Sequence, residues 1–226
     1  KFRKIVFENF KTNYPLRNLI NLQKKLARKL ILEDKFKKLE CIAGIDVSYY
    51  DNIGIGACAV LDYRSKKILE AKTVSKKVNF PYIPTYLAFR ELPAIKEVIS
   101  KLRKKPDILM IDGNGVLHPL GIGIASHAGV VLNIPTIGVA KTLLCGKVEK
   151  TRLRAGESTK IFYNSKLVGF CLKTVKDAKP IYISPGHKVS FETTLEIVKY
   201  LSVSRIPEPL RLADSISRKI LKNMRC

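Results

Sequence analysis

ECIAGIDVSYYDNIGIGACAVLDYRSKKILEAKTVSKKV, residues 40–78, is the stretch of sequence that decides the fold. Residues 40–50, 54–63 and 66–78 have the composition and length of β-strands. The segments DNIG and YRSKK between them are rich in turn-forming residues. Three strands joined by two short turns predict an antiparallel meander.

After the meander, predicted helices alternate with short buried strands. PDILMID (106–112) and PTIGVA (135–140) are apolar runs typical of buried strands. Helices are predicted over 16–31, 85–104, 121–133, 188–202 and 209–224, and two or three further strands over 160–184. The helix over 85–104 is expected to break at Pro93, and the helix over 121–133 ends before Pro135. We expect one α/β domain over residues 1–226, a mixed sheet flanked by helices, with ligands at the carboxyl ends of its parallel strands.

The helix predicted over 16–31 is amphipathic. Its apolar stripe consists of Leu16, Leu19, Ile20, Leu26, Ala27, Leu30 and Ile31. Lys24, Lys25, Arg28 and Lys29 fall mostly on the other face. That basic face either is simply solvated or contacts DNA, and the pattern alone does not choose.

Charge is the strongest global property of the chain. Its 42 Lys and Arg against 19 Asp and Glu give a net charge of +23, which attracts polyanions and favours nucleic acid as a partner. A Lys-rich surface adapted to heat or salt would normally carry more Glu. No apolar run spans a membrane, no secretory signal is evident, and the five cysteines form no CxxC pair. We therefore expect a cytoplasmic protein with reduced thiols and no obligate protein partner.

Acidic residues occur where a buried strand would not normally place them. Asp46 lies within an apolar strand that offers no Lys or Arg to pair with it. Asp112 ends a buried strand, and Gly113 and Gly115 then allow a tight turn close to a ligand. Metal coordination is the better interpretation of Asp46, against a paired or capping Asp. DGNG alone also fits an ordinary turn.

Glu91 and Asp214, taken singly, fit solvated helix positions. Gathered with Asp46 and Asp112, they would repel one another without a cation. Hard oxygen ligands call for Mg²⁺, or Mn²⁺ as a substitute. Two such ions roughly 3.5–4 Å apart can activate water and stabilise a leaving 3′ oxygen, which is phosphodiester hydrolysis.

Five segments together resemble one family, endonuclease V. They are AGIDVSY (43–49), FPYIPTYLAFRELP (80–93), PDILMIDGNGVLHPLGIGIASHAGVVLNIPTIGVAKTLL (106–144), ISPGHKVS (183–190) and RIPEPLRLAD (205–214). The resemblance covers nearly the whole chain. It implies an RNase H-like fold and a DNA repair endonuclease that depends on Mg²⁺. It also implies cleavage of the second phosphodiester bond 3′ to deoxyinosine, leaving 3′-hydroxyl and 5′-phosphate ends.

The resemblance also implies roles for individual residues. Asp46 and Asp112 match the metal-binding pair, with Glu91 as the third acid. Lys141 matches the lysine near the scissile phosphate, and Asp214 a position that carries Asp or His in the family. His118 matches the histidine of the glycine-rich loop, where it would orient a phosphate or a metal-bound water.

Residues 80–93 match the segment that family members push into the duplex, with Tyr82 as a wedge stiffened by prolines. The extruded base would lie against Thr85, Leu87, Gly113, Gly115, Gly123 and Ile124. Position 85 is commonly Gly in the family and is Thr here, which leaves inosine selectivity open. His127 is interpreted as a structural residue held by hydrogen bonds.

Three hypotheses remain at this point: a metal-dependent endonuclease, a non-catalytic nucleic-acid-binding protein, and a small-molecule phosphotransferase. The +23 charge and the absence of a P-loop motif disfavour the phosphotransferase. The presence of all the family's acids disfavours the non-catalytic protein. The resemblance implies inosine-containing DNA, single- or double-stranded, as the partner, with inosine-containing RNA as the alternative, and the sequence does not separate DNA from RNA.

Overall fold

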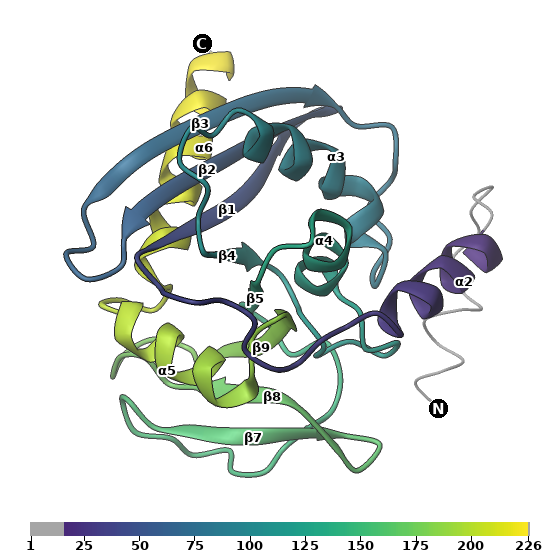
Figure 1. Ribbon diagram of the computed structural model, residues 1–226, viewed down its shortest axis with the longest axis vertical. Helices are drawn as coiled ribbons and strands as arrows, with labels where there is room; N and C mark the ends of the chain where they lie inside the picture. Colours follow the sequence, from purple (N-terminus) through teal and green to yellow (C-terminus); the bar gives the residue numbers. More distant parts are fainter. Residues whose placement is uncertain (1–15, 226) are drawn as a thin grey trace.

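The computed structural model describes residues 16–225, whose strands all join one nine-stranded sheet of order β3-β2-β1-β4-β5-β9-β8-β7-β6 (Figure 1). Strands β1, β4 and β5 run parallel, and the remaining pairs are antiparallel. The strands are β1 (Cys41–Tyr50), β2 (Ile53–Asp62), β3 (Ile68–Lys77), β4 (Ile108–Asp112), β5 (Thr136–Ala140), β6 (Lys147–Val148), β7 (Ser158–Tyr163), β8 (Lys166–Leu172) and β9 (Ile181–His187).

Helices cover both faces of the sheet. They are α2 (Leu16–Ala27), α3 (Leu87–Ser100), α4 (Ile124–Leu132), α5 (Phe191–Leu201) and α6 (Glu208–Arg225). Helices α3 and α4 pack on one face, against the odd-numbered residues of β1. Helices α5 and α6 pack on the other, where Ile42 of β1 joins Met110 and Val198 in the core. The predicted mixed sheet flanked by helices is confirmed; one domain over 1–226 reaches beyond the described residues and stays a prediction.

Helix α6 crosses the sheet at very close range because β1 has a glycine beneath it. A Cβ atom on Gly44 would lie only 2.1 Å from the carbonyl carbon and oxygen of Pro209. A side chain at this position would therefore push α6 off the strand. The close approach brings Ser217, two turns further along α6, into contact with Ser48 of β1.

The structure corrects several boundaries. Pro93 does not break α3, because its exposed side faces solvent while Ala94, Ile95 and Val98 bury the same helix on the sheet. The helix predicted over 16–31 ends at Ala27, four residues early. Beyond Ala27 the chain continues with tighter hydrogen bonds between residues three apart, from Lys29 N–H to the Leu26 carbonyl and from Leu30 N–H to the Ala27 carbonyl.

Two further differences concern the second half of the chain. The two-residue strand β6 was not predicted, because it is too short to show a periodicity. His187 is the last residue of β9 and is buried, three residues beyond the range 160–184 over which the sequence predicted strands. Its Nδ1 accepts a hydrogen bond from the Ile31 N–H, so it fixes the chain that leaves α2.

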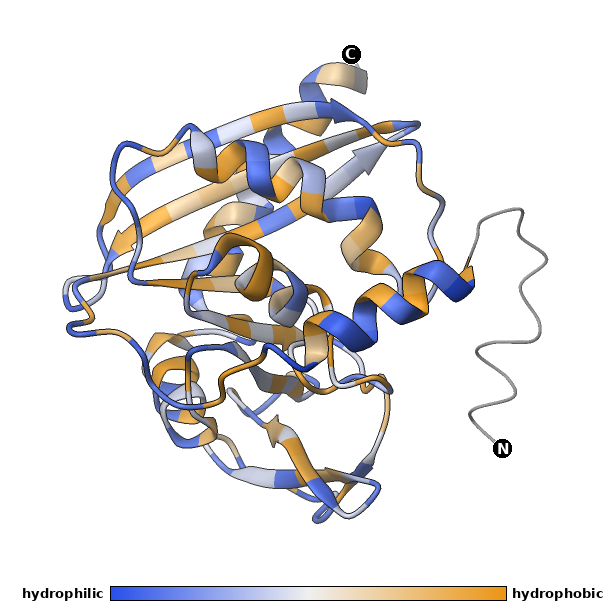
Figure 2. Cartoon of the chain, turned by 45° about the vertical axis from the view of Figure 1, so that its right-hand side comes forward, coloured by the Kyte–Doolittle hydropathy of each residue, from blue (hydrophilic) through white to orange (hydrophobic). Residues whose placement is uncertain are grey.

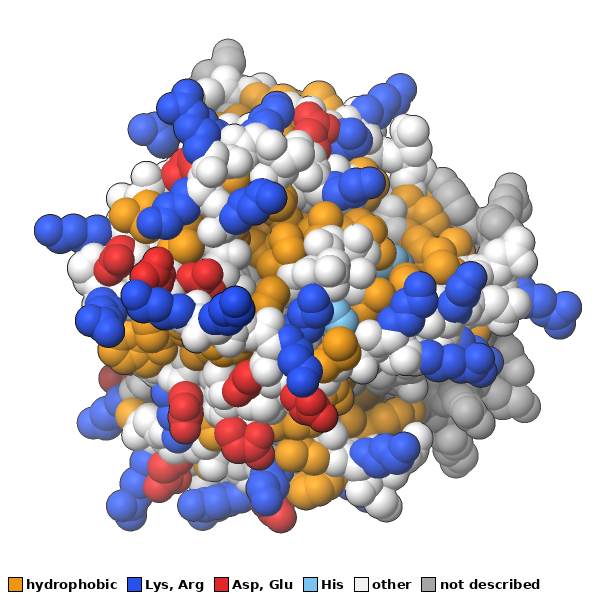
Figure 3. Space-filling view, viewed as in Figure 1, with side chains coloured by type: hydrophobic (Ala, Val, Ile, Leu, Met, Phe, Trp, Pro, Cys, Tyr) orange, Lys and Arg blue, Asp and Glu red, His pale blue; other side chains and the backbone are white. Residues whose placement is uncertain are grey.

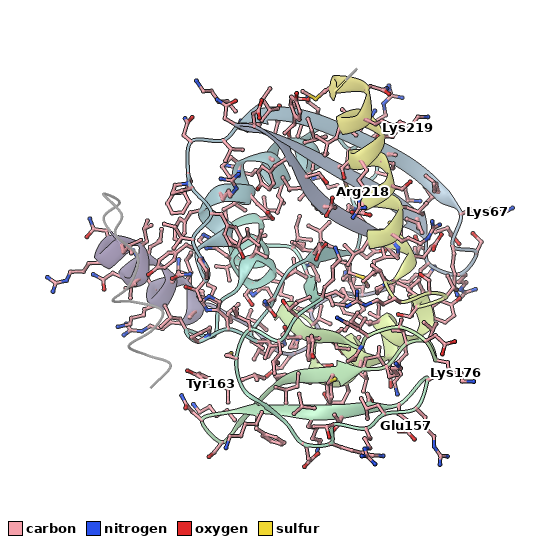
Figure 4. All side chains as sticks on the ribbon, turned by 180° about the vertical axis from the view of Figure 1, so that it is seen from behind. Lys67, Glu157, Tyr163, Lys176, Arg218 and Lys219 are labelled. Atoms are coloured by element: carbon pink, nitrogen blue, oxygen red, sulfur yellow. The ribbon has the colours of Figure 1, made fainter. Side chains whose placement is uncertain are left out.

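Basic side chains are scattered over the face seen in Figure 1, at its rim and across its middle, with apolar surface between them and acidic side chains mainly at the left and below the centre (Figure 3). On the far side, Lys67 and Lys176 extend from loops into solvent (Figure 4). None of the helices within residues 16–225 is both long enough and apolar enough to cross a membrane.

Candidate active site

Asp46 and Asp112 become neighbours through the parallel register of β1 and β4. The register pairs Ile45 with Ile111, and its continuation by one residue sets the two aspartates side by side. Strand β4 ends at Asp112, the carboxyl end at which the sequence predicted a ligand site, and Asp46 lies beside it within the longer strand β1.

Two hydroxyl groups hold the Asp46 side chain, which is 8% exposed. Ser48 Oγ and Ser217 Oγ donate to Asp46 Oδ2 at 3.1 and 2.8 Å. Burial raises the pKa of Asp46, and the charges of Asp112 and Asp214 raise it further, while the two serine bonds lower it. Asp46 thus has neutral hydrogen-bond donors but no Lys or Arg bonded to it within the described residues.

Glu91 approaches the same place from α3. It is 7% exposed, and Tyr49 Oη donates to its Oε1 at 3.0 Å. Burial, with the charges of Asp112 and Asp46, raises the pKa of Glu91 to about 8. The Arg90 guanidinium lies over the Tyr49 ring at 4.1 Å and donates to the Phe80 carbonyl at 2.6 Å. Arg90 and Tyr49, which the sequence did not single out, therefore join Glu91 to the segment that carries Tyr82.

Lys141 and Asp214 complete the charged cluster. Lys141, just beyond β5, binds Asp112 Oδ2 through its Nζ at 2.5 Å. Burial lowers the pKa of Lys141, but the charge and hydrogen bond of Asp112 outweigh it, and the net direction is upward. Asp214 lies on α6 and pairs with Arg218, labelled beside that helix in Figure 4, at 2.9 Å.

Asp46, Glu91 and Asp112 line one open pocket together with Tyr49, Tyr82, Val47, Leu87 and Arg90. Hard carboxylate oxygens whose charges raise one another's pKa are the donor set that suits a divalent cation. As placed, however, no three His, Cys, Asp or Glu side chains of the described chain stand close enough to share an ion. The chemistry of the site fits such a metal, while the spacing by itself does not define one.

A second pocket, of about 480 Å³, adjoins the first. Both are lined by Tyr82, Leu87 and Asp112. Among the predicted base-contacting residues, those that line the larger pocket are Tyr82, Thr85, Leu87, Gly113, His118, Gly123 and Ile124. Gly115 is not in the lining; it lies behind it, where its N–H donates to Ser184 Oγ and its carbonyl accepts from Gly123 N–H.

Gly113 lines this pocket at a position where a side chain would not fit. Its φ is +146°, and a Cβ there would lie 2.4 Å from Ile124 Cγ2. Tyr82 stands at the junction of the two pockets and is 65% exposed, an unusual fraction for an aromatic residue. The arrangement places an exposed aromatic ring where the 480 Å³ pocket meets the pocket of the acids.

A tight turn connects Tyr82 to α3. The Tyr86 N–H donates to the Ile83 carbonyl at 3.0 Å, and Pro84 and Thr85 are the central residues of the turn. Thr85 has a φ of +72°. Proline followed by a residue of positive φ is the pattern of a type II turn, which normally requires Gly at the second position. The threonine therefore carries backbone strain of about 1–3 kcal/mol.

His118 is tied to that turn. Its Nδ1 accepts from the Leu120 N–H at 3.1 Å, so Nε2 carries the proton and donates to the Thr85 carbonyl at 3.0 Å. Burial lowers the pKa of His118 to about 4, which keeps this neutral tautomer. Both nitrogens thus serve backbone groups, and we interpret His118 as a brace of the pocket wall. Its contact with a phosphate or a metal-bound water stays a prediction.

His127 is also neutral, since burial lowers its pKa to about 4. Its ring meets Phe89 edge-on at 5.2 Å between centroids. The expected hydrogen bond is not found for Nδ1, which has no partner among the described residues. Packing against Phe89 supports its interpretation as a structural residue.

The chain is similar to one family of known proteins over most of its length. Residues 24–215 match the model of the family described as Endonuclease V. An endonuclease V of Dictyoglomus turgidum is 41% identical over 205 residues, 90% of each chain. The crystal structure of the Bacillus subtilis endonuclease V superposes with a TM-score of 0.87 at 30% identity, covering 96% of this chain and 95% of that one.

A second solved structure, from Ciona intestinalis, shows an endonuclease V bound to a 24mer DNA that contains an inosine followed by a ribo-adenosine. Its TM-score is 0.82 at 30% identity, with 92% of this chain and 98% of that chain covered.

Proposed function

The chain belongs to the endonuclease V family, and from that premise we propose that it is a DNA repair nuclease that recognises deoxyinosine and cuts the second phosphodiester bond on its 3′ side. The products are a 3′-hydroxyl and a 5′-phosphate. The observation that carries the proposal is the pair of adjoining pockets, one lined by three acids and one of about 480 Å³ with room for a base, with Tyr82, Leu87 and Asp112 common to both.

Tyr82 acts as the wedge. Enzymes that examine a single base commonly take it out of the stack, and an inserted side chain offsets the lost stacking. The exposed Tyr82 ring, followed by the Pro84–Thr85 turn, is suited to this because little freedom remains to be lost on binding. The extruded base then enters the pocket walled by Leu87, Gly113 and Ile124. The inosine carried by the DNA bound to the Ciona protein supports this substrate.

Asp46 and Asp112 are the residues that would hold Mg²⁺, or Mn²⁺ in its place, with Glu91 as the third acid. When bound, such an ion supplies an activated water and charge stabilisation for the leaving oxygen. The protein's own groups orient the site: Ser48 and Ser217 fix Asp46, and Tyr49 fixes Glu91.

Lys141 adds a positive charge on the pocket wall beside Asp112. A compact cation in this position can offset negative charge that develops on the scissile phosphate. The net charge of +23 retains the nucleic acid through its backbone, independently of sequence.

The test is a nicking assay on labelled duplexes, with and without one deoxyinosine, in Mg²⁺, Mn²⁺, Ca²⁺ or EDTA, and on the matching inosine-containing RNA. Nicking near inosine that requires Mg²⁺ or Mn²⁺ supports the proposal. Retarded migration without nicking would indicate a non-catalytic binding protein. No interaction with either nucleic acid would overturn the assignment.

Asp46→Ala should abolish nicking and leave duplex binding largely intact. Asp177→Ala is the matched control, because Asp177 is exposed in the loop between β8 and β9 and lines neither pocket. Equal activity of the Asp46 variant and the control would refute the metal assignment.

A further inference from the structure

The inner face of α2 has a polar residue at its centre. Gln23 is 1% exposed and is the one fully buried residue of this helix. It occupies the helical position between Leu19 and Ile20 on one side and Leu26 and Ala27 on the other. Figure 2 shows α2 alternating between hydrophilic and hydrophobic residues along its length. A leucine or methionine would be the expected occupant of such a position.

The buried amide reaches across 62 residues of sequence to the Pro84–Thr85 turn. Gln23 Nε2 donates to the Thr85 carbonyl at 2.8 Å. The same carbonyl accepts from His118 Nε2 at 3.0 Å. Two donors thus fix the one peptide group that follows the left-handed residue of the turn.

The rest of the Gln23 amide has no compensating bond. Its Oε1 is buried and has no hydrogen-bond partner among the described residues. Reversing the amide would set oxygen against the Thr85 carbonyl oxygen, so the orientation is fixed by that carbonyl. A buried acceptor without a partner is unfavourable, and an apolar side chain would fill the space without it. Packing alone therefore does not account for a glutamine here, whereas the bond to Thr85 does.

The turn controls the geometry of both pockets. Tyr82 lies just before it and Leu87 just after it, and both line the two pockets. Glycine would adopt the positive φ of position 85 without cost, but threonine does so only when neighbouring groups hold it. The structure gives that task to His118 from the glycine-rich loop and to Gln23 from α2.

We propose that Gln23 is a positioning residue for base recognition: it holds Thr85 in the left-handed conformation, and so sets the wedge and pocket wall for inosine. This inference rests on the proposed function. It assigns α2 a part in substrate selection and gives a physical reason why this chain accepts Thr where the turn favours Gly.

The test is a double-mutant cycle between Gln23→Met and Thr85→Gly. Methionine retains the length of glutamine and removes the amide. Gln23→Met should raise KM for the inosine duplex about tenfold, the worth of one backbone hydrogen bond, and change kcat less than about twofold. In the Thr85→Gly background the same substitution should change KM less than about twofold, because glycine needs no support.

Asn21→Met, at an exposed position of the same helix, is the matched control and should leave KM unchanged. Unchanged KM in Gln23→Met would overturn the inference while leaving the proposed function intact. The inference would also be overturned if Gln23→Met lowered the melting temperature and reduced activity equally on all substrates, and if Thr85→Gly did not restore that activity. That pattern indicates a purely structural role. Failure of the wild-type protein to nick inosine duplexes would overturn the proposed function, and the inference with it.

Discussion

Substitution of Glu91 by glutamine should stabilise the protein while it inactivates the site. Glutamine is nearly isosteric, and its amide oxygen can still accept the Tyr49 hydroxyl. The folded protein keeps a proton on Glu91 up to about pH 8, whereas an unfolded glutamate releases it near 4.5. Between these values the unfolded state binds fewer protons, so the free energy of unfolding falls as the pH rises.

The magnitude follows from the distance between the pH and the unfolded pKa. Between 4.5 and pH 7 this distance is about 2.5 pH units, each worth about 1.4 kcal/mol, so removing the ionisable group should raise the free energy of unfolding at pH 7 by about 3 kcal/mol. The gain should vanish below about pH 4.5 and level off above about pH 8. Such a profile identifies a buried carboxyl group and not a general improvement in packing.

The measurement is urea unfolding of Glu91→Gln and wild type in EDTA from pH 4 to 8, with nicking activity measured in parallel in Mg²⁺. Glu97→Gln is the matched control, because Glu97 lies on the same helix but accepts a bond from Lys76 at 2.8 Å, which lowers its pKa. The control should show no stabilisation at any pH. A stability difference for Glu91→Gln that is independent of pH, or a loss of stability at pH 7, would refute the reasoning.

The other predictions concern the wedge, the lysine and the buried histidine. Tyr82→Ala should weaken binding to an inosine duplex roughly 5- to 150-fold, the worth of one stacked base, with little effect on undamaged duplex in the same gel-shift titration; equal losses on both would contradict the wedge. Lys141→Met should lower kcat for nicking by about 10²–10³ in single-turnover assays, and an unchanged kcat would remove it from the mechanism. Between pH 4 and 6.5 the His118 ring is neutral in the folded protein and protonated in the unfolded one, so the free energy of unfolding of the wild type rises with pH. His118→Asn should lower that slope by about 1.4 kcal/mol per pH unit, measured by urea unfolding. Equal slopes for the two proteins would show that His118 does not titrate as described.

Sequence patterns predicted the sheet because it depends on local properties. The meander, the buried strands at Asp112 and Ala140, and the helices on both faces all follow from composition, periodicity and turn residues. The break expected at Pro93 was wrong because tertiary burial outweighed the lost hydrogen bond. The neighbouring positions of Asp46 and Asp112 depend on the parallel pairing of β1 with β4, which brings the middle of one strand beside the end of the other.

The supporting residues of the site could not be predicted in the same way. Tyr49 bonds to Glu91 across 42 residues and Ser217 to Asp46 across 171, and neither has a distinctive local pattern. Gln23 did leave a signal, a polar residue in the middle of an apolar helical stripe. The sequence could raise the question of what it binds, but only the fold shows that its partner is the carbonyl of Thr85.

Two different electrostatic interactions operate in this molecule: Lys and Arg attract the polyanion, and the carboxylates of the site attract a cation. Hydroxyl groups of Ser48, Ser217 and Tyr49 orient Asp46 and Glu91 and bring no positive charge to them, although the net charge of the chain is +23. The distributed Lys and Arg side chains bind the polyanion by a mechanism that monovalent salt weakens. The central carboxylates need a multivalent cation close to them, and salt at ordinary concentrations does not replace it. Duplex affinity should therefore fall steeply with monovalent salt in EDTA. Nicking should still require a divalent ion, and the same one, at every salt concentration at which the duplex is bound.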